Sequence, residues 1–159
     1  MRIAFIFLFA FSIVNTNAQV RAIKFPELQN LMSNKSDSIL VLNFWATLCG
    51  PCVAEFRYFQ ELQKNYSDKK LKVIFISLDF KREIDTKLVP FVKAKNVQSP
   101  VYLIDEPDYN SWIDKVDVRW SGAIPATLII NEKGQHYFFE RGFTSYLELE
   151  KIVKPLIDK

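Results

Sequence analysis

The chain has 159 residues, of which 49% are hydrophobic, and a formal net charge of +3. This length and apolar content suit one globular domain, and the charge is too small to predict nucleic-acid binding or a polybasic membrane surface. The chain has two cysteines and one histidine. This argues against a structural zinc site, which takes four ligands, and we expect neither a metal nor another cofactor.

The first 18 residues have the pattern of an export signal. Arg2 supplies a minimal positive charge, residues 3–14 form a nearly unbroken apolar stretch, and residues 15–18 form a polar, small-residue exit. The apolar stretch is too short for a membrane-spanning helix, which needs about 20 residues. We therefore expect a signal peptide over residues 1–18, cleaved or kept as a tether, and one domain over residues 19–159 that faces the periplasm.

Apolar periodicity then predicts alternating helices and strands. Residues 25–32 have helical spacing, and residues 39–45 and 71–78 are nearly continuous apolar runs, typical of strands buried on both faces. Between these strands, a helix is predicted from the two cysteines to about Tyr66. Pro51 suits its first turn, because a proline there costs no helical hydrogen bond.

The middle of the chain continues this alternation with shorter elements. Residues 83–95 predict a helix, in which Pro90 is expected to cause a kink or a late start. A short strand over residues 100–104 and a short helix over residues 109–116 follow.

The end of the chain predicts a hairpin and a helix. Residues 126–130 and 136–140 flank the turn signal of residues 131–134. Ser145 is expected to cap a terminal helix with four side chains available for burial: Leu147, Leu149, Ile152 and Val153. This order of elements predicts an α/β fold, with a mixed sheet and helices on both of its faces.

The only cysteines, Cys49 and Cys52, stand three residues apart where the first buried strand gives way to its helix. Residues at i and i+3 face each other across a helical turn, within reach of a disulfide. A purely structural bridge would close a minimal loop and add little stability. Haem attachment needs a histidine after the second cysteine, where this chain has Val53. Thiol–disulfide exchange is therefore the leading hypothesis.

The position of each cysteine predicts its role. Cys49 would begin the helix, where free N–H groups and the helix dipole favour a thiolate, so it is the expected nucleophile. Cys52, one turn inside the helix, is expected to be buried and to resolve the mixed disulfide. Glu55 lies three residues further on. It is the candidate proton acceptor for Cys52 if burial raises its pKa, and otherwise an ordinary solvated glutamate.

Residues 44–52 and 122–129 resemble two motifs of the thioredoxin superfamily, the Cys-Gly-Pro-Cys site and the cis-proline segment. The closer resemblance is to exported proteins of the TlpA/ResA type, and it covers about residues 39–142. It implies a thioredoxin-like three-layer sandwich with helices on both faces of a mixed sheet. It also implies an added strand–helix element within about residues 82–104.

The resemblance also assigns site residues. Pro125 would be the cis-proline beside the disulfide, and the backbone of Ile124 would pair with the bound substrate. Trp45 is a candidate for substrate binding, although core packing beside the site is the favoured interpretation. A glutamate at the position of Glu55 recurs in the TlpA/ResA branch, which supports its role in proton transfer.

Three residues call for separate interpretation. Leu48 replaces an aromatic residue that often precedes the first cysteine, so the surface offered to partners differs. Asn43 stands where cytoplasmic thioredoxins carry a buried aspartate, and it is expected to be a hydrogen-bonded buried amide that cannot accept the proton of Cys52. His136, on the predicted hairpin, is interpreted as structural.

The combined prediction is an extracytoplasmic oxidoreductase, monomeric, that reduces protein disulfides and is recharged by a membrane electron donor of the DsbD type. Candidate substrates include cysteines of apocytochrome c and of copper sites, and misfolded envelope proteins. The alternatives are a disulfide oxidase or isomerase, a thiol peroxidase, and a binding module without catalysis. The peroxidase is disfavoured because no Pro-x-x-x-Thr-x-x-Cys run surrounds Cys49.

Overall fold

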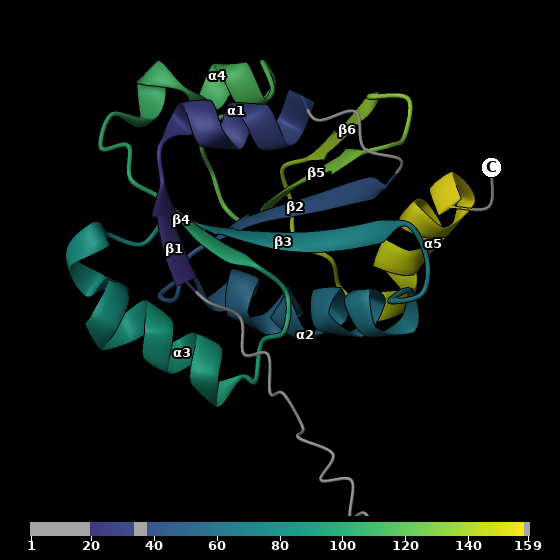
Figure 1. Ribbon diagram of the computed structural model, residues 1–159, viewed down its shortest axis with the longest axis horizontal. Helices are drawn as coiled ribbons and strands as arrows, with labels where there is room; N and C mark the ends of the chain where they lie inside the picture. Colours follow the sequence, from purple (N-terminus) through teal and green to yellow (C-terminus); the bar gives the residue numbers. More distant parts are fainter. Residues whose placement is uncertain (1–19, 34–37, 158–159) are drawn as a thin grey trace, which may run out of the picture.

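The computed structural model describes residues 20–33 and 38–157, so the expected signal peptide lies outside the described residues. The centre of the fold is a six-stranded sheet with the strand order β1-β4-β3-β2-β5-β6 (Figure 1). The strands are β1 (Val20–Ile23), β2 (Ile39–Trp45), β3 (Leu71–Ser77), β4 (Val101–Ile104), β5 (Ala126–Ile130) and β6 (His136–Phe139). The first four in chain order pair in parallel, whereas β5 and β6 are antiparallel. The predicted mixed sheet is confirmed.

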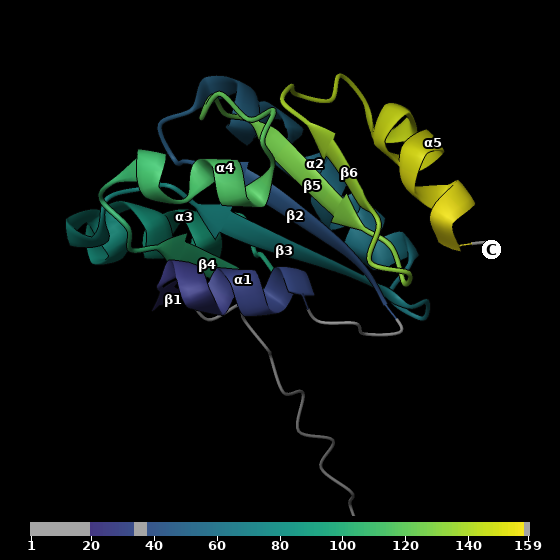
Figure 2. The same cartoon turned by 90° about the horizontal axis from the view of Figure 1, so that it is seen from above.

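Helices cover both faces of this sheet, as predicted. Figures 1 and 2 show α1 (Phe25–Ser33) and α4 (Ile113–Val116) on one face. The other face carries α2 (Gly50–Asn65), α3 (Val89–Ala94) and α5 (Tyr146–Ile157). The three layers enclose two apolar cores, one on each side of the sheet.

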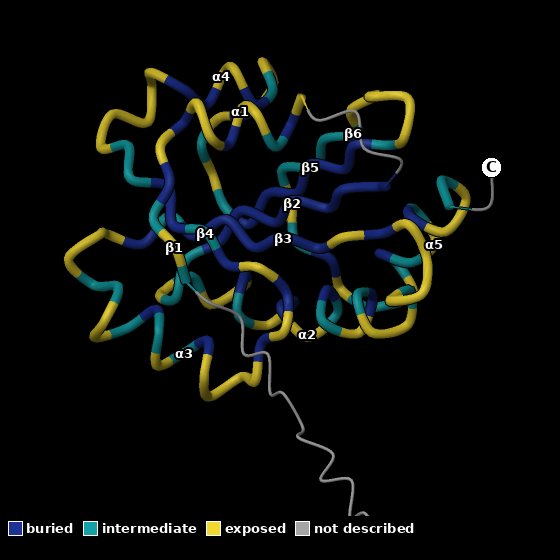
Figure 3. The backbone as a smooth tube through the Cα atoms, viewed as in Figure 1, coloured by how far each residue is buried: buried dark blue, intermediate teal, exposed yellow. Residues whose placement is uncertain are grey.

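Strand β2 lies at the centre of both cores and leads directly to the cysteines. All seven of its residues are buried, and they alternate between the two cores because successive side chains of a strand point to opposite faces. Val41 and Trp45 enter the core under α2, whereas Leu42 and Phe44 enter the core under α1. Figure 3 shows this buried centre in dark blue. The strand thus holds the start of α2 on a rigid support.

Two stretches differ from the predicted elements. Strand β1 was not predicted, and it pairs in parallel with β4 at the edge of the sheet. The helix predicted over residues 83–95 is divided into a 3₁₀ turn at Lys81–Glu83, a π-helical turn at Ile84–Leu88 and α3. Pro90 is the second residue of α3, directly after the π-helical turn, so its missing N–H falls where the helical hydrogen-bond pattern changes. The predicted late start is therefore confirmed for the α-helical part.

The terminal helix α5 confirms the predicted cap but corrects one predicted core residue. The Glu148 N–H donates to Ser145 Oγ at 3.2 Å, which satisfies one free donor of the first turn. Leu149 and Val153 are fully buried. The prediction for Leu147 was wrong, because its side chain is 71% exposed. None of the described helices is long and apolar enough to cross a membrane.

We expect Leu149→Ala to lower the free energy of unfolding by about 2–5 kcal/mol, because it leaves a cavity in the core under α5. Leu147→Ala is the matched control, since it removes the same atoms from an exposed position and should change this free energy by less than about 0.5 kcal/mol. Denaturant unfolding of the oxidised protein measures both. Equal losses in the two variants would contradict the packing described for α5.

Candidate active site

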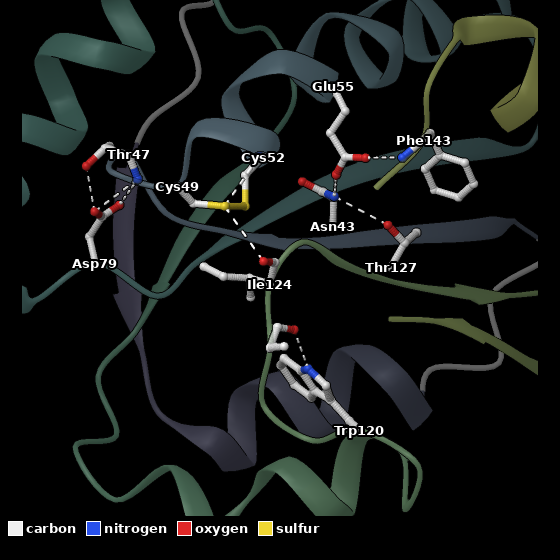
Figure 4. The surroundings of a disulfide bond; sticks show 11 residues. Asn43, Thr47, Cys49, Cys52, Glu55, Asp79, Trp120, Ile124, Thr127 and Phe143 are labelled. Atoms are coloured by element: carbon white, nitrogen blue, oxygen red, sulfur yellow. Dashed lines mark hydrogen bonds between the residues drawn. A yellow bond between two sulfur atoms is a disulfide. The ribbon is translucent and has the colours of Figure 1, made fainter. Parts of the chain in front are cut away.

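The two cysteines lie at the carboxyl end of β2, at the first turn of α2, and they form a disulfide with an S–S distance of 2.02 Å (Figure 4). Cys49 is the N-cap residue of α2, with extended backbone angles. The N–H of Cys52 points at Cys49 Sγ at a distance of 3.3 Å. A donor aimed at this sulfur would also stabilise negative charge on it when the pair is reduced.

The cysteines differ in accessibility. Cys49 is half-buried at the surface of the site, whereas Cys52 is fully buried beneath it. A thiolate must reach a partner's disulfide to attack it, so only Cys49 is placed to meet another protein. The predicted burial of Cys52 is confirmed. Leu48 precedes this residue and is 76% exposed, so an apolar side chain stands free directly before Cys49.

The segment before β5 forms a wall beside the disulfide. The peptide bond between Ile124 and Pro125 is cis, as the resemblance implied. The carbonyl oxygen of Ile124 lies 3.9 Å from Cys49 Sγ, and Ile124 is half-buried whereas Pro125 is buried. Strand β5 pairs with β2, which brings this segment to the site from 75 residues further along the chain.

Trp45 supports the site from below. Its side chain is fully buried, and its ring packs against the rings of Phe56, Phe75 and Phe91 at centroid distances of 4.7, 6.3 and 4.9 Å. Its indole nitrogen has no hydrogen-bond partner among the described residues. In this conformation the side chain offers no surface to a substrate, which agrees with the core-packing interpretation.

Glu55 is a buried carboxylate one helical turn after Cys52. It is 1% exposed. Its Oε1 accepts a hydrogen bond from Asn43 Nδ2 at 3.0 Å, and its Oε2 accepts one from the N–H of Phe143 at 2.7 Å (Figure 4). Burial raises the pKa of Glu55 above its ordinary value, although the hydrogen bonds from Phe143 and Asn43 act in the opposite direction. The carboxyl group therefore holds a proton more readily than an exposed glutamate.

Asn43 is the hydrogen-bonded buried amide that was predicted. It is fully buried in β2, and its Nδ2 also donates to Thr127 Oγ1 at 3.3 Å. Its Oδ1 has no partner among the described residues. Amide oxygen and nitrogen are nearly equal in shape, so turning the amide over would present an acceptor to Glu55. Asn43 can therefore serve either protonation state of the carboxyl group.

His136 lies away from these residues. It is exposed at the start of β6 and is paired with Ile130, at the far end of β5 from Pro125. Within residues 20–33 and 38–157, no group of three or more His, Cys, Asp and Glu side chains is arranged to hold a metal ion.

A second buried carboxylate near the disulfide was not predicted. Asp79 follows β3 and accepts hydrogen bonds from Thr47, two residues before Cys49 (Figure 4). Its signal in the sequence is its position two residues after a buried strand. Carboxyl ends of neighbouring parallel strands share one edge of the sheet. A polar residue just after the carboxyl end of β3 was therefore a candidate to contact the segment that leads to the cysteines.

Gly142 lies between two candidate site residues. A Cβ atom on it would lie 3.3 Å from Pro125 Cγ and 3.5 Å from Glu55 Oε2. Both neighbours are buried, and Glu55 is also held by its hydrogen bonds. The close packing of the site thus favours a residue without a side chain at this position.

We expect Gly142→Ala to lower the free energy of unfolding by about 1–3 kcal/mol, because the added methyl group overpacks the site. A Cβ atom on Gly50 would have no neighbour within 4 Å, so Gly50→Ala is the matched control. This control should change the free energy by no more than about 0.5 kcal/mol. The measurement is denaturant unfolding of both oxidised variants, and an unaffected Gly142→Ala would show that the site has room to relax.

Comparison with known proteins places the chain in a family. The model of the AhpC/TSA family matches residues 14–135. The chain is 30% identical over 125 residues to the thioredoxin-like protein YneN of Bacillus subtilis, covering 79% of this chain and 68% of that protein. It is 34% identical over 98 residues to the thiol-disulfide oxidoreductase ResA of Oceanobacillus iheyensis, covering 60% of this chain but 45% of that protein.

Solved structures agree on the fold. A thiol:disulfide interchange protein of the thioredoxin family from Chlorobium tepidum superposes with a TM-score of 0.64 at 20% identity, covering 77% of this chain and 82% of that one. At this identity the likeness concerns the fold, and it confirms the predicted thioredoxin-like architecture. From the extent of the family match and the relation to YneN, the chain belongs to the AhpC/TSA family of thioredoxin-like proteins.

Proposed function

We propose that this protein is an extracytoplasmic thiol–disulfide oxidoreductase that reduces disulfides of other proteins. The observation that carries the proposal is the half-exposed Cys49 at the start of α2, bonded to the fully buried Cys52. One sulfur can reach a partner, and the other is protected until the first has reacted. The printed name of ResA, a thiol-disulfide oxidoreductase, supports the same chemistry.

In the first step, the reduced Cys49 attacks as a thiolate. Its sulfur forms a bond to one sulfur of the substrate disulfide, and the other substrate sulfur leaves as a thiolate. The free N–H groups at the start of α2, including that of Cys52, stabilise the charge on Cys49 before the attack. The backbone of Ile124, beside Cys49 Sγ, is the proposed docking edge for the substrate chain.

In the second step, Cys52 attacks Cys49 Sγ. This forms the Cys49–Cys52 disulfide, breaks the mixed disulfide and releases the second substrate thiolate, so two electrons pass from the protein to the substrate. Cys52 must lose its proton before it attacks. Glu55 is the proposed acceptor, since it lies one turn further along α2 and its raised pKa suits proton uptake.

The reducing direction rests on the residues between the cysteines. Strong oxidants stabilise their reduced thiolate, often with a histidine between the cysteines, whereas this chain has Gly50 and Pro51 there. A reductase outside the cytoplasm needs a source of electrons, and a membrane donor of the DsbD type is the proposed one. Cysteines of apocytochrome c, copper-site cysteines and misfolded envelope proteins are the proposed substrates, and the proposed working form is a monomer.

A redox titration of the Cys49–Cys52 pair against glutathione or dithiothreitol buffers tests the direction. We expect a reduction potential near that of thioredoxin, about −270 mV. A value near that of DsbA, about −120 mV, would instead identify an oxidase.

A further inference from the structure

A buried carboxylate holds the segment that leads to Cys49. Asp79 is 7% exposed. Both of its oxygens lie 3.1 Å from the backbone N–H of Thr47, and its Oδ1 also accepts a hydrogen bond from Thr47 Oγ1 at 2.6 Å. Its Oδ2 accepts a further hydrogen bond from Ser77 Oγ at 2.7 Å. The exchange steps described above make no use of this carboxylate.

The hydrogen bonds to Asp79 form part of a continuous tether between β3 and the cysteine segment. The N–H of Leu78 donates to the carbonyl oxygen of Trp45 at 2.8 Å. Within the segment, the N–H of Cys49 donates to the carbonyl oxygen of Ala46 at 3.1 Å. The chain is therefore fixed to the end of β3 at Trp45 and Thr47, and a tight turn then leads to Cys49.

Cys49 Sγ, at the end of this segment, lies close to two backbone groups. The sulfur lies 3.3 Å from the N–H of Cys52 and 3.9 Å from the carbonyl oxygen of Ile124. In the oxidised protein the disulfide also holds this sulfur, so in the reduced protein its position depends on the backbone of Cys49, the N-cap residue of α2. A buried carboxylate is costly unless donors satisfy it, and here donors of Thr47 and Ser77 do so.

We propose that Asp79 is a positioning residue, which fixes the loop before Cys49 through Thr47 and so holds Cys49 Sγ against the N-terminus of α2. The inference rests on the proposed role of Cys49 in thiol–disulfide exchange. Its effect on the thiolate has two parts with opposite signs. The anchor stabilises the thiolate by keeping its donors in place, whereas the negative charge of Asp79 opposes it.

The charge of Asp79 also reaches Tyr109, which follows β4. The hydroxyl of Tyr109 donates to the carbonyl oxygen of Leu78 at 3.2 Å. Burial raises the pKa of Tyr109, and the negative charge of Asp79 adds to this rise. Tyr109 is neutral where a cysteine titrates, so it does not disturb the test below.

Two pairs of variants separate the effect of the Asp79–Thr47 hydrogen bonds from the effect of the negative charge of Asp79. Asp79→Ala removes both, whereas Asp79→Asn removes the charge and keeps an acceptor oxygen for Thr47. Thr47→Val removes the hydroxyl donor, whereas Thr47→Ser keeps it. Asp68→Ala is the control for loss of a carboxylate. Asp68 is exposed in the turn before β3, so it lies at the opposite end of the parallel strands from the cysteines.

The readout is the pH midpoint for alkylation of Cys49 by iodoacetamide in the reduced protein, with the modified residue identified by mass spectrometry. We expect the midpoint of Asp79→Ala to lie about one pH unit above that of Asp79→Asn, a tenfold difference in thiolate at a given pH. The alkylation midpoint of Thr47→Val should also lie above that of Thr47→Ser, but by less than the difference expected for the two Asp79 variants. Thr47→Ser and Asp68→Ala should match the wild type.

Equal midpoints within each pair would overturn the positioning role. If Asp79→Ala does not fold, the Thr47 pair decides alone. Alkylation needs no protein substrate, so the result is independent of the proposed reductase activity. A wild-type protein that reduces no disulfide but shows the expected differences would refute the proposed function and leave the positioning role intact.

Discussion

Cys49→Ser is expected to abolish catalytic reduction of a protein disulfide, with a loss of at least about a thousandfold in rate. A hydroxyl at the start of α2 cannot supply the thiolate that attacks sulfur. Cys52→Ser should also fail to turn over, but for a different reason. Its Cys49 still attacks once, and the mixed disulfide then persists because no buried thiol is present to resolve it.

The measurement is the release of substrate thiols from insulin by each variant, which is reduced beforehand and freed of the chemical reductant, because an excess of small thiol would itself resolve the mixed disulfide. The expected pattern is no release for Cys49→Ser and one substrate thiol per protein for Cys52→Ser. The exposed-site variant Asp68→Ala should behave as the wild type. If Cys49→Ser replaced the wild-type protein in the cell without loss, the protein would instead be a binding module that keeps the fold without thiol–disulfide exchange.

Glu55→Gln is expected to slow the resolving step by about a hundredfold, because it removes the proposed proton acceptor for Cys52. The variant should still fold. Its amide oxygen can accept the hydrogen bond from the N–H of Phe143, and its NH₂ group can donate to the Oδ1 of Asn43 once that amide turns over. Both polar atoms of the introduced amide therefore find partners, while Asn43 Nδ2 takes the buried position in which Oδ1 now has none.

Stopped-flow measurement of the second thiol release tests this expectation across a range of pH. In the wild type, the rate of resolution should rise as Glu55 loses its proton, and in Glu55→Gln this dependence should disappear. The first attack by Cys49 should be unchanged and serves as the internal control. If the second release keeps both its rate and its pH dependence in the variant, Glu55 has no part in the mechanism.

The raised pKa of Glu55 also gives a prediction for stability. Below the ordinary value of 4.5, the carboxyl group is protonated in both the folded and the unfolded chain. Above it, the unfolded chain ionises first, so stability falls with rising pH until the folded carboxyl group ionises as well. Relative to the wild type, Glu55→Gln should therefore be more stable near neutral pH than below pH 4.5. Denaturant unfolding of both oxidised proteins at the two pH values measures this difference, and an equal offset at both would contradict it.

The buried strands and the cysteine helix could be predicted because their patterns are local. The seven residues of β2 are all buried, so their apolar run gives the correct bounds. Strand β1 has four residues, of which one is fully buried, and so short a pattern carries little information. On α5, Leu149 and Val153 are four residues apart and share a face. Leu147 is two residues before Leu149, about 200° around the helix, and so faces solvent.

In the candidate site, too, some features follow from local sequence and others depend on how distant strands pair. The roles expected of Cys49 and Cys52 follow from one helix start, and the burial of Glu55 follows from its place on the inner face of α2. The tether at Asp79 depends instead on the register of two strands. Trp45 pairs with Ser77 at the end of the β2–β3 ladder, which brings Asp79 to Thr47 across 32 residues of sequence. No local pattern contains this contact.

We propose above all that the sulfur of Cys49 attacks the disulfide of a partner. The most direct test is to incubate reduced Cys52→Ser with a disulfide-containing protein, quench with acid and map the mixed disulfide by mass spectrometry. The matched variant Cys49→Ser, which keeps the buried Cys52, is treated in the same way. We expect a mixed disulfide on Cys49 in the first variant and none in the second. A mixed disulfide formed equally well by Cys52, or none on Cys49, would contradict it.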